Sequence, residues 1–166
     1  MTGHNPTDRS KLGTKRHILT DKDGIPLSAI ITSANTHDVT VAIETVDSMV
    51  IKRPSSKSTT KYRNNNDKNK NKKKNQNLCL DKAYHSQEIE QEITKRGYIP
   101  HIRYRREEKK HNNRHPARRW VVERTNSWHN NRFRKLFTRY EKKDKNYLGL
   151  VQLANSIIIY RRLILG

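Results

Sequence analysis

The chain of 166 residues carries 36 lysines and arginines against 16 aspartates and glutamates, which gives a formal net charge of +20. Its length suits one domain with a modest core, and the excess of cations predicts a polyanionic partner, most commonly nucleic acid. The single cysteine, Cys79, excludes an internal disulfide, and no apolar run approaches the roughly 20 residues of a membrane span. We therefore expect a cytoplasmic, nucleoid-associated protein rather than a membrane protein.

The first third of the chain predicts a β-hairpin followed by a helix. Residues 15–20 and 25–33 are the two strands, and Asp21, Asp23 and Gly24 between them offer local side-chain hydrogen bonds and a positive φ angle. Asp38 then suits the start of a helix that runs to residue 51 with apolar side chains at a helical period. His37, beside it, suits equally a turn or cap and a supporting contact to a catalytic group.

Residues 53–76 differ in composition from the rest of the chain. From residue 61 onward they are almost wholly asparagine and lysine, without one aliphatic side chain. Such a segment has too little apolar surface to stabilise a packed structure, so we expect a disordered insertion. Its lysines suit a solvated, passive segment better than a contact to nucleic acid, although both interpretations remain open.

The second half of the chain alternates strands and helices. Residues 77–80 predict a buried strand that ends at Asp81, and residues 86–96 a helix between a serine cap and Gly97. Residues 98–104 predict another strand, in which Pro100 marks an edge or a kink. A basic loop over 105–116, a helix over 118–136 and a mostly buried helix over 147–165 complete the chain. This order predicts a layered α/β or α+β domain.

The helix over 118–136 is rich in arginine and carries one carboxylate, Glu123. Trp120, Val121 and Trp128 predict its apolar face, so core packing is favoured over base stacking for both tryptophans. Glu123 lies on another face, one turn after Arg119. It suits either a solvated ion pair or a ligand that holds a divalent metal ion against a phosphate backbone.

Asp81, at the end of its predicted strand, is the natural partner for Glu123. Open α/β sheets expose functional groups at the carboxyl ends of their strands, and two carboxylates brought together need a cation between them. Hard oxygen ligands favour Mg²⁺ or Mn²⁺ over zinc. Two such ions would hold the attacking and leaving oxygens of a phosphoryl displacement. The sequence has no zinc-finger spacing, glycine-rich phosphate loop or Gly-x-Ser-x-Gly motif.

Several motifs together resemble the prokaryotic insertion-sequence transposases of the DDE class, of the IS-four and IS-five types. They are NPTDRSKLGTKRHILTDKDGIPL, SANTHD, LCLDKAY, and RRWVVERTNSW with FRKLFTRYEKK. The resemblance implies an RNase H-like mixed sheet flanked by helices, in which two aspartates and a glutamate bind two Mg²⁺ (or Mn²⁺) ions. Such enzymes cleave and transfer DNA strands at terminal inverted repeats.

By this resemblance Asp81 matches the second catalytic aspartate and Glu123 the final glutamate, so both are expected metal ligands. Arg119 matches the signature arginine of the family. The expected DNA contacts come from basic residues around the two carboxylates: Lys82, Arg119, Arg124 and Arg132.

The chain departs from the family pattern in three places. Pro116 replaces an expected tyrosine, and Asn130 replaces a basic residue. The doublet Asn130–Asn131 looks like a one-residue insertion, which would turn Arg132 round the helix by about 100°. The first aspartate of the family lies on a central strand upstream of the TGHNPTDR segment. The acidic residues in early loops or turns are poor substitutes for it: Asp8, Asp21 and Asp23.

The resemblance therefore implies that residues 1–166 are the C-terminal part of a catalytic domain whose central strand is missing. We expect such a chain to be weak or inactive alone, and to assemble as a homodimer or with a polypeptide from an upstream reading frame. A non-enzymatic DNA-binding remnant, or a regulator of a full-length transposase, is the alternative. An RNA-binding protein fits less well, because only 7% of the residues are aromatic and they are scattered.

Overall fold

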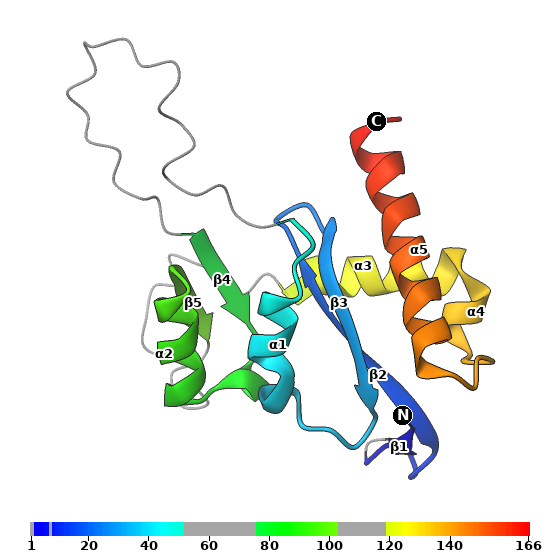
Figure 1. Ribbon diagram of the computed structural model, residues 1–166, viewed down its shortest axis with the longest axis horizontal. Coiled ribbons are helices and arrows are strands. Elements are labelled where there is room, and N and C mark those ends of the chain that lie inside the picture. The colour runs from blue at the N-terminus through cyan, green and yellow to red at the C-terminus, as the bar shows by residue number, and fades with distance from the viewer. Residues whose placement is uncertain (1, 7, 52–75, 103–118) are drawn as a thin grey trace.

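The computed structural model describes residues 2–6, 8–51, 76–102 and 119–166, which form a mixed α/β fold with two small sheets (Figure 1). The predicted insertion, apart from Gln76, and the predicted basic loop with Pro116 lie outside these ranges. The side chain of Arg119 is also outside the described part.

The predicted hairpin is confirmed as strands β2 (Leu12–Thr20) and β3 (Pro26–Ser33), which pair antiparallel. Its turn forms for the predicted reasons. The Asp21 carboxylate accepts hydrogen bonds from the backbone N–H groups of Asp23 (2.9 Å) and Ile25 (2.8 Å), and Gly24 has a φ angle of 79°. A two-residue strand, β1 (Gly3–His4), pairs with the beginning of β2.

The second sheet is a parallel βαβ unit, which confirms the predicted order. Strand β4 (Gln76–Leu80) and strand β5 (Tyr98–Ile102) pair in parallel. The 3₁₀ helix η2 (Lys82–Tyr84) and the helix α2 (Gln87–Lys95) connect them. The prediction of a buried β4 holds only for Leu78, since the neighbouring side chain of Cys79 is exposed.

Helices cover both faces of the hairpin. Successive side chains of a strand point to opposite faces of the sheet, so each face has side chains that a helix can contact. On one face, the Ser28 hydroxyl donates to the Thr45 carbonyl of helix α1 (Ala42–Asp47) at 2.6 Å. On the other, Ala29 and Ile31 pack against a cluster that includes Val151 of helix α5 (Asp144–Leu163). Figure 1 shows α1 and α5 on opposite sides of β3.

Two predicted helices have different bounds or faces in the structure. The helix predicted to run to residue 51 is a 3₁₀ turn, η1 (Asp38–Val41), followed by α1, which ends at Asp47. Its β-branched residues explain the weak helix, because they lose side-chain freedom there. The last helix was expected to be mostly core, yet Leu153 and Leu163 are 57% and 62% exposed.

The helix α3 (Arg119–Arg132) is shorter than predicted, and of its predicted apolar face Val121 is buried, Trp128 is half-buried and Trp120 is exposed. The helix breaks at Phe133, and a single turn, α4 (Arg134–Phe137), follows. The predicted core position of Trp120 is wrong, since its side chain is 55% exposed. The buried face consists of residues four apart: Val121, Thr125 and His129.

Thr125 and His129 tolerate burial because each has a distant hydrogen-bond partner. The Thr125 hydroxyl donates to the Gly24 carbonyl in the hairpin turn (2.6 Å). One ring nitrogen of His129, Nε2, lies 2.8 Å from the Asn155 Oδ1 atom of α5. The other, Nδ1, is buried without a hydrogen-bond partner in the described part of the chain. The neutral ring with a proton on Nε2 fits this arrangement.

This buried ring makes the stability of the protein depend on pH. Burial lowers the pKa of His129 below its ordinary value, and the nearby charge of Arg16 adds to the effect, while the hydrogen bond to Asn155 opposes it. As the pH falls below about 6.5, His129 therefore takes up a proton in the unfolded chain, whereas in the folded chain it stays neutral to a lower pH. We expect the free energy of unfolding to fall below pH 6.5, by up to about 1.4 kcal/mol per pH unit from this residue. Burial lowers the pKa of His17 as well, so its contribution has the same sign.

Urea denaturation between pH 7.5 and 5.0 measures this dependence. In His129→Gln, an amide that also donates to Asn155 replaces the titrating ring, so the curve should be flatter than that of the unaltered chain. Equal curves for both proteins would show that His129 is not the titrating group.

Candidate functional site

Asp81 follows β4 directly, at the carboxyl end of the parallel pair. Its exposed carboxylate accepts a hydrogen bond from the backbone N–H of Lys82 (2.7 Å) and so caps η2. This capping fixes the start of η2 without burying the side chain. The structure thus places Asp81 where the sequence predicted it, at the end of a strand.

A second carboxylate, Asp38, lies close to the same region. The 3₁₀ helices η1 and η2 pack together. The negative charges of Asp38 and Asp81 both act on the hydroxyl of Tyr84 in η2. Burial, with these two charges, raises the pKa of Tyr84 to about 12. The Lys15 ammonium donates to the Asp38 carboxylate (3.0 Å) and to the Thr36 carbonyl (2.8 Å). This neighbourhood therefore combines two carboxylates with one cation.

From the sequence, Asp38 is expected only at the start of a helix. Its position as the first residue of η1 agrees with that interpretation. Its proximity to Tyr84, however, arises from a contact between segments far apart in the chain. The signal that pointed to it was the SANTHD motif, which was read for the family resemblance and not for the site.

Glu123 is exposed in the first half of α3. Within the described ranges, no group of three or more histidine, cysteine, aspartate or glutamate side chains is placed to hold a metal ion. Asp81 and Glu123 therefore do not belong to a three-ligand cluster among those residues. Their exposed carboxylate oxygens do have the donor chemistry that Mg²⁺ and Mn²⁺ prefer, and Mg²⁺ usually keeps several water ligands.

The expected DNA-contacting cations have different surroundings. Arg132 is exposed at the end of α3, and Lys82 is partly exposed. The Arg124 guanidinium instead donates to the Asp23 carbonyl (2.5 Å) and stacks on the rings of Trp120 (4.9 Å) and Trp128 (5.3 Å). It connects α3 to the hairpin turn.

The family pattern has a basic residue at the position of Asn130 on α3. In this chain a cation from strand β2 lies beside Asn130 instead. The Arg16 guanidinium of β2 donates to the Asn130 Oδ1 atom at 2.7 Å. Asn130 itself lacks the positive charge of the family residue, but the guanidinium of Arg16 brings a positive charge to the same place. Sequence reasoning missed Arg16, because the contact joins residues more than a hundred positions apart.

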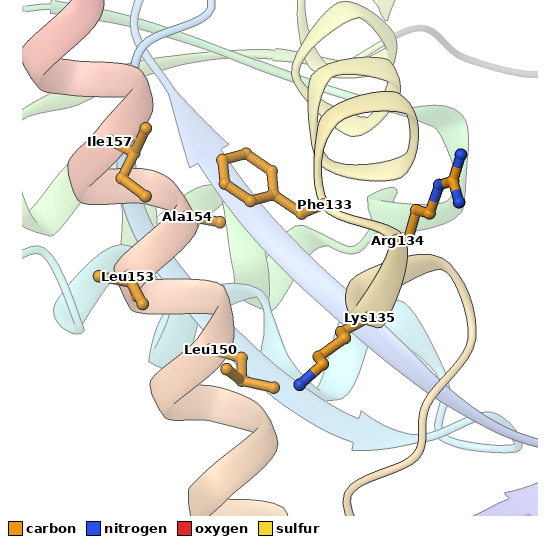
Figure 2. Close-up of a pocket in the computed structure, with 7 residues that line it drawn as sticks. All are labelled: Phe133, Arg134, Lys135, Leu150, Leu153, Ala154 and Ile157. Atoms are coloured by element: carbon orange, nitrogen blue, oxygen red, sulfur yellow. The ribbon is translucent and has the colours of Figure 1, made fainter.

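Two shallow hollows flank α4, and neither contains an acidic group. The first, of about 210 Å³, lies between α4 and α5 (Figure 2). Figure 2 shows Phe133 facing Ala154, while the Lys135 side chain reaches toward Leu150. Seven residues line this first hollow: Phe133, Arg134, Lys135, Leu150, Leu153, Ala154 and Ile157. The lining is apolar apart from the two cations, and it contains no carboxylate that could bind a metal ion.

Among the described residues, no helix has the length and apolar character that crossing a membrane requires.

Comparisons with known proteins connect these features. The family described as "Transposase DDE domain" matches residues 2–159. A Burkholderia cepacia protein named as a transposase for insertion sequence element IS402 is 33% identical over 167 residues, which cover 98% of this chain and 70% of that protein. No solved structure matches the chain. The matched region includes Asp38, Asp81 and Glu123.

Proposed function

This chain belongs to the family of DDE transposase domains, and from that premise we propose that it takes part in cleaving and transferring DNA strands at the ends of an insertion sequence. One observation carries the proposal: the family match spans both candidate carboxylates, and Asp81 is exposed at the carboxyl end of a strand. The net charge of +20 supports a DNA substrate. A protein with this activity acts at the nucleoid.

We assign Asp81 and Glu123 as ligands of divalent metal ions, Mg²⁺ or Mn²⁺. Two bound ions would polarise the scissile phosphate and stabilise the attacking and leaving oxygens. The protein residues then have two tasks. The carboxylates balance the charge of the ions, and the basic side chains around them hold the DNA backbone: Lys82, Arg119, Arg124 and Arg132.

The two sheets fit an RNase H-like architecture if they are two parts of one mixed sheet. Among the described residues, β4 pairs only with β5, and β2 meets β1 only at its first residues, Leu12 and Gly13. Each sheet therefore has an open edge that accepts a further strand. We propose that a further strand, which carries the first catalytic aspartate, pairs there.

The 166 residues alone are then expected to cleave DNA weakly or not at all. The support is that the family resemblance assigns two of its three carboxylates, to Asp81 and Glu123, and that the described residues contain no cluster of three possible metal ligands. The same observation favours the second candidate function, a DNA-binding regulator of a full-length transposase that acts either by occupying its DNA ends or by assembling with it.

A nicking assay tests the proposal. The chain is incubated with DNA that carries the terminal repeats of its own element, with Mg²⁺ or Mn²⁺, and with or without a polypeptide that supplies an aspartate-bearing strand. Cleavage only in the presence of that polypeptide would support the split transposase. Cleavage by the 166 residues alone would contradict the need for another strand. Binding without cleavage in every mixture would favour the regulator.

A further inference from the structure

The second hollow beside α4 combines exposed aromatic side chains with cations. We call it the α4 hollow. Its volume is about 370 Å³, near the lower end of the roughly 300–1,000 Å³ that small-ligand pockets span. Six residues of the α3–α4–α5 connection line it: Asn130, Arg134, Lys135, Phe137, Thr138 and Tyr140.

The two aromatic side chains of the α4 hollow face solvent. Phe137 is 72% exposed and Tyr140 is 75% exposed. The tyrosine hydroxyl makes no hydrogen bond within the described residues, so nothing in this part of the chain explains its outward position. Two exposed rings at one hollow offer flat apolar surfaces that a planar ligand can cover.

The residues between these rings anchor the segment firmly. Leu136 is 3% exposed and belongs to the core cluster beneath α5. The Arg139 guanidinium donates to the Thr14 hydroxyl (2.5 Å), the Glu141 carbonyl (2.8 Å) and the Asp144 carboxylate (2.6 Å). Inward-facing Leu136 and Arg139 therefore alternate with the outward-facing rings. The backbone that carries the rings is therefore anchored before any ligand arrives, which lowers the entropic cost of binding.

The charges at the α4 hollow suit an anionic ligand. Arg134 and Lys135 line it, and neither forms an ion pair with a carboxylate in the described ranges. The Arg16 guanidinium does not line the hollow, but it donates to Asn130, which does, so its positive charge lies close by. Figure 2 shows the Arg134 side chain pointing away from α5. Stacking rings beside free cations are the combination that binds single-stranded nucleic acid.

We propose that the α4 hollow binds an unpaired nucleotide of the DNA substrate, with its base against Phe137 and Tyr140 and its phosphate at Arg134 and Lys135. The inference rests on the proposed function. The α4 hollow lies roughly 15 Å along α3 from Glu123, at 1.5 Å per residue. It is therefore separate from the candidate metal ligands.

The test uses the 166-residue chain and a short single-stranded oligonucleotide with one 2-aminopurine base, beside a duplex of the same sequence. Stacking on an aromatic ring should quench the fluorescence of the 2-aminopurine. The double variant Phe137→Ala/Tyr140→Ala should lose this quenching and bind the single strand about 5- to 100-fold more weakly. Its affinity for the duplex should change less than about twofold, since the phosphate contacts remain.

Two controls separate stacking from other causes. Tyr160→Ala removes another aromatic ring, 53% exposed on α5 and outside the hollow, and should behave like the unaltered chain. Tyr140→Phe keeps a ring and should retain the quenching. Equal losses in Tyr160→Ala and the double variant, or no quenching by the unaltered chain while it binds duplex, would overturn the inference. If the unaltered chain binds neither DNA form, the proposed function fails together with it.

Discussion

Replacing Asp81 by asparagine, or Glu123 by glutamine, is expected to lower metal-dependent cleavage of terminal-repeat DNA by at least about a hundredfold. Each substitution preserves the shape of the side chain and removes the negative charge that a metal ligand needs. Metal ions supply several kcal/mol of charge stabilisation in the transition state, and each 1.4 kcal/mol corresponds to a factor of ten in rate. The comparison is made in whichever mixture cleaves, the chain alone or with the accompanying polypeptide.

The affinity of both variants for duplex DNA should stay constant or rise, because a negative charge near phosphate is removed. Glu88→Gln is the matched control. It removes an exposed carboxylate from the first turn of α2 and should change neither cleavage nor binding. Unchanged cleavage in Asp81→Asn and Glu123→Gln would show that neither carboxylate is a metal ligand. Lost DNA binding in both would indicate a structural role instead.

The sequence predicted those parts of the fold that depend on neighbouring residues. The hairpin turn follows from Asp21 and Gly24, which act within their own turn. The end of α2 in the βαβ unit follows from Gly97, which has a φ angle of 78°. Ser86 stands at the start of α2 as predicted, but its side chain does not make the expected capping hydrogen bond. Asp81 was placed correctly for the same reason, because an apolar run that stops at a carboxylate locates the end of a strand.

Long-range contacts explain what the sequence did not predict. Apolar periodicity favoured Trp120 for the core. Thr125 and His129 are buried instead, because Gly24 accepts the hydrogen bond of the Thr125 hydroxyl and Asn155 bonds one ring nitrogen of His129. No spacing along α3 reveals partners in the hairpin turn and in α5. The neighbourhood of Asp38 is a further case, since Lys15 and Tyr84 approach it only in the folded chain.

The affinity of the chain for duplex DNA is expected to fall by about a thousandfold or more between 50 and 200 mM salt. A protein that neutralises 6–10 phosphates releases as many condensed counterions, and such proteins lose about 10³–10⁵ in affinity over this range. A net charge of +20 on 166 residues provides enough cations for that number of contacts. Fluorescence anisotropy with a labelled duplex, repeated at several salt concentrations, gives the slope of log K against log salt.

Substitution of Arg132 and of Arg124 distinguishes an effect on DNA binding from an effect on the stability of the fold. The exposed Arg132 should contribute mainly to binding, so Arg132→Ala should reduce the salt slope by about one and leave the free energy of unfolding unchanged. Arg124→Ala should also lower the free energy of unfolding by about 1–2 kcal/mol, because the guanidinium binds the Asp23 carbonyl and stacks on two tryptophans. A weak salt dependence in the unaltered chain would contradict a phosphate-dominated interface. An unchanged slope in Arg132→Ala would place the DNA away from the end of α3, and the basic face would then have to be sought on another element.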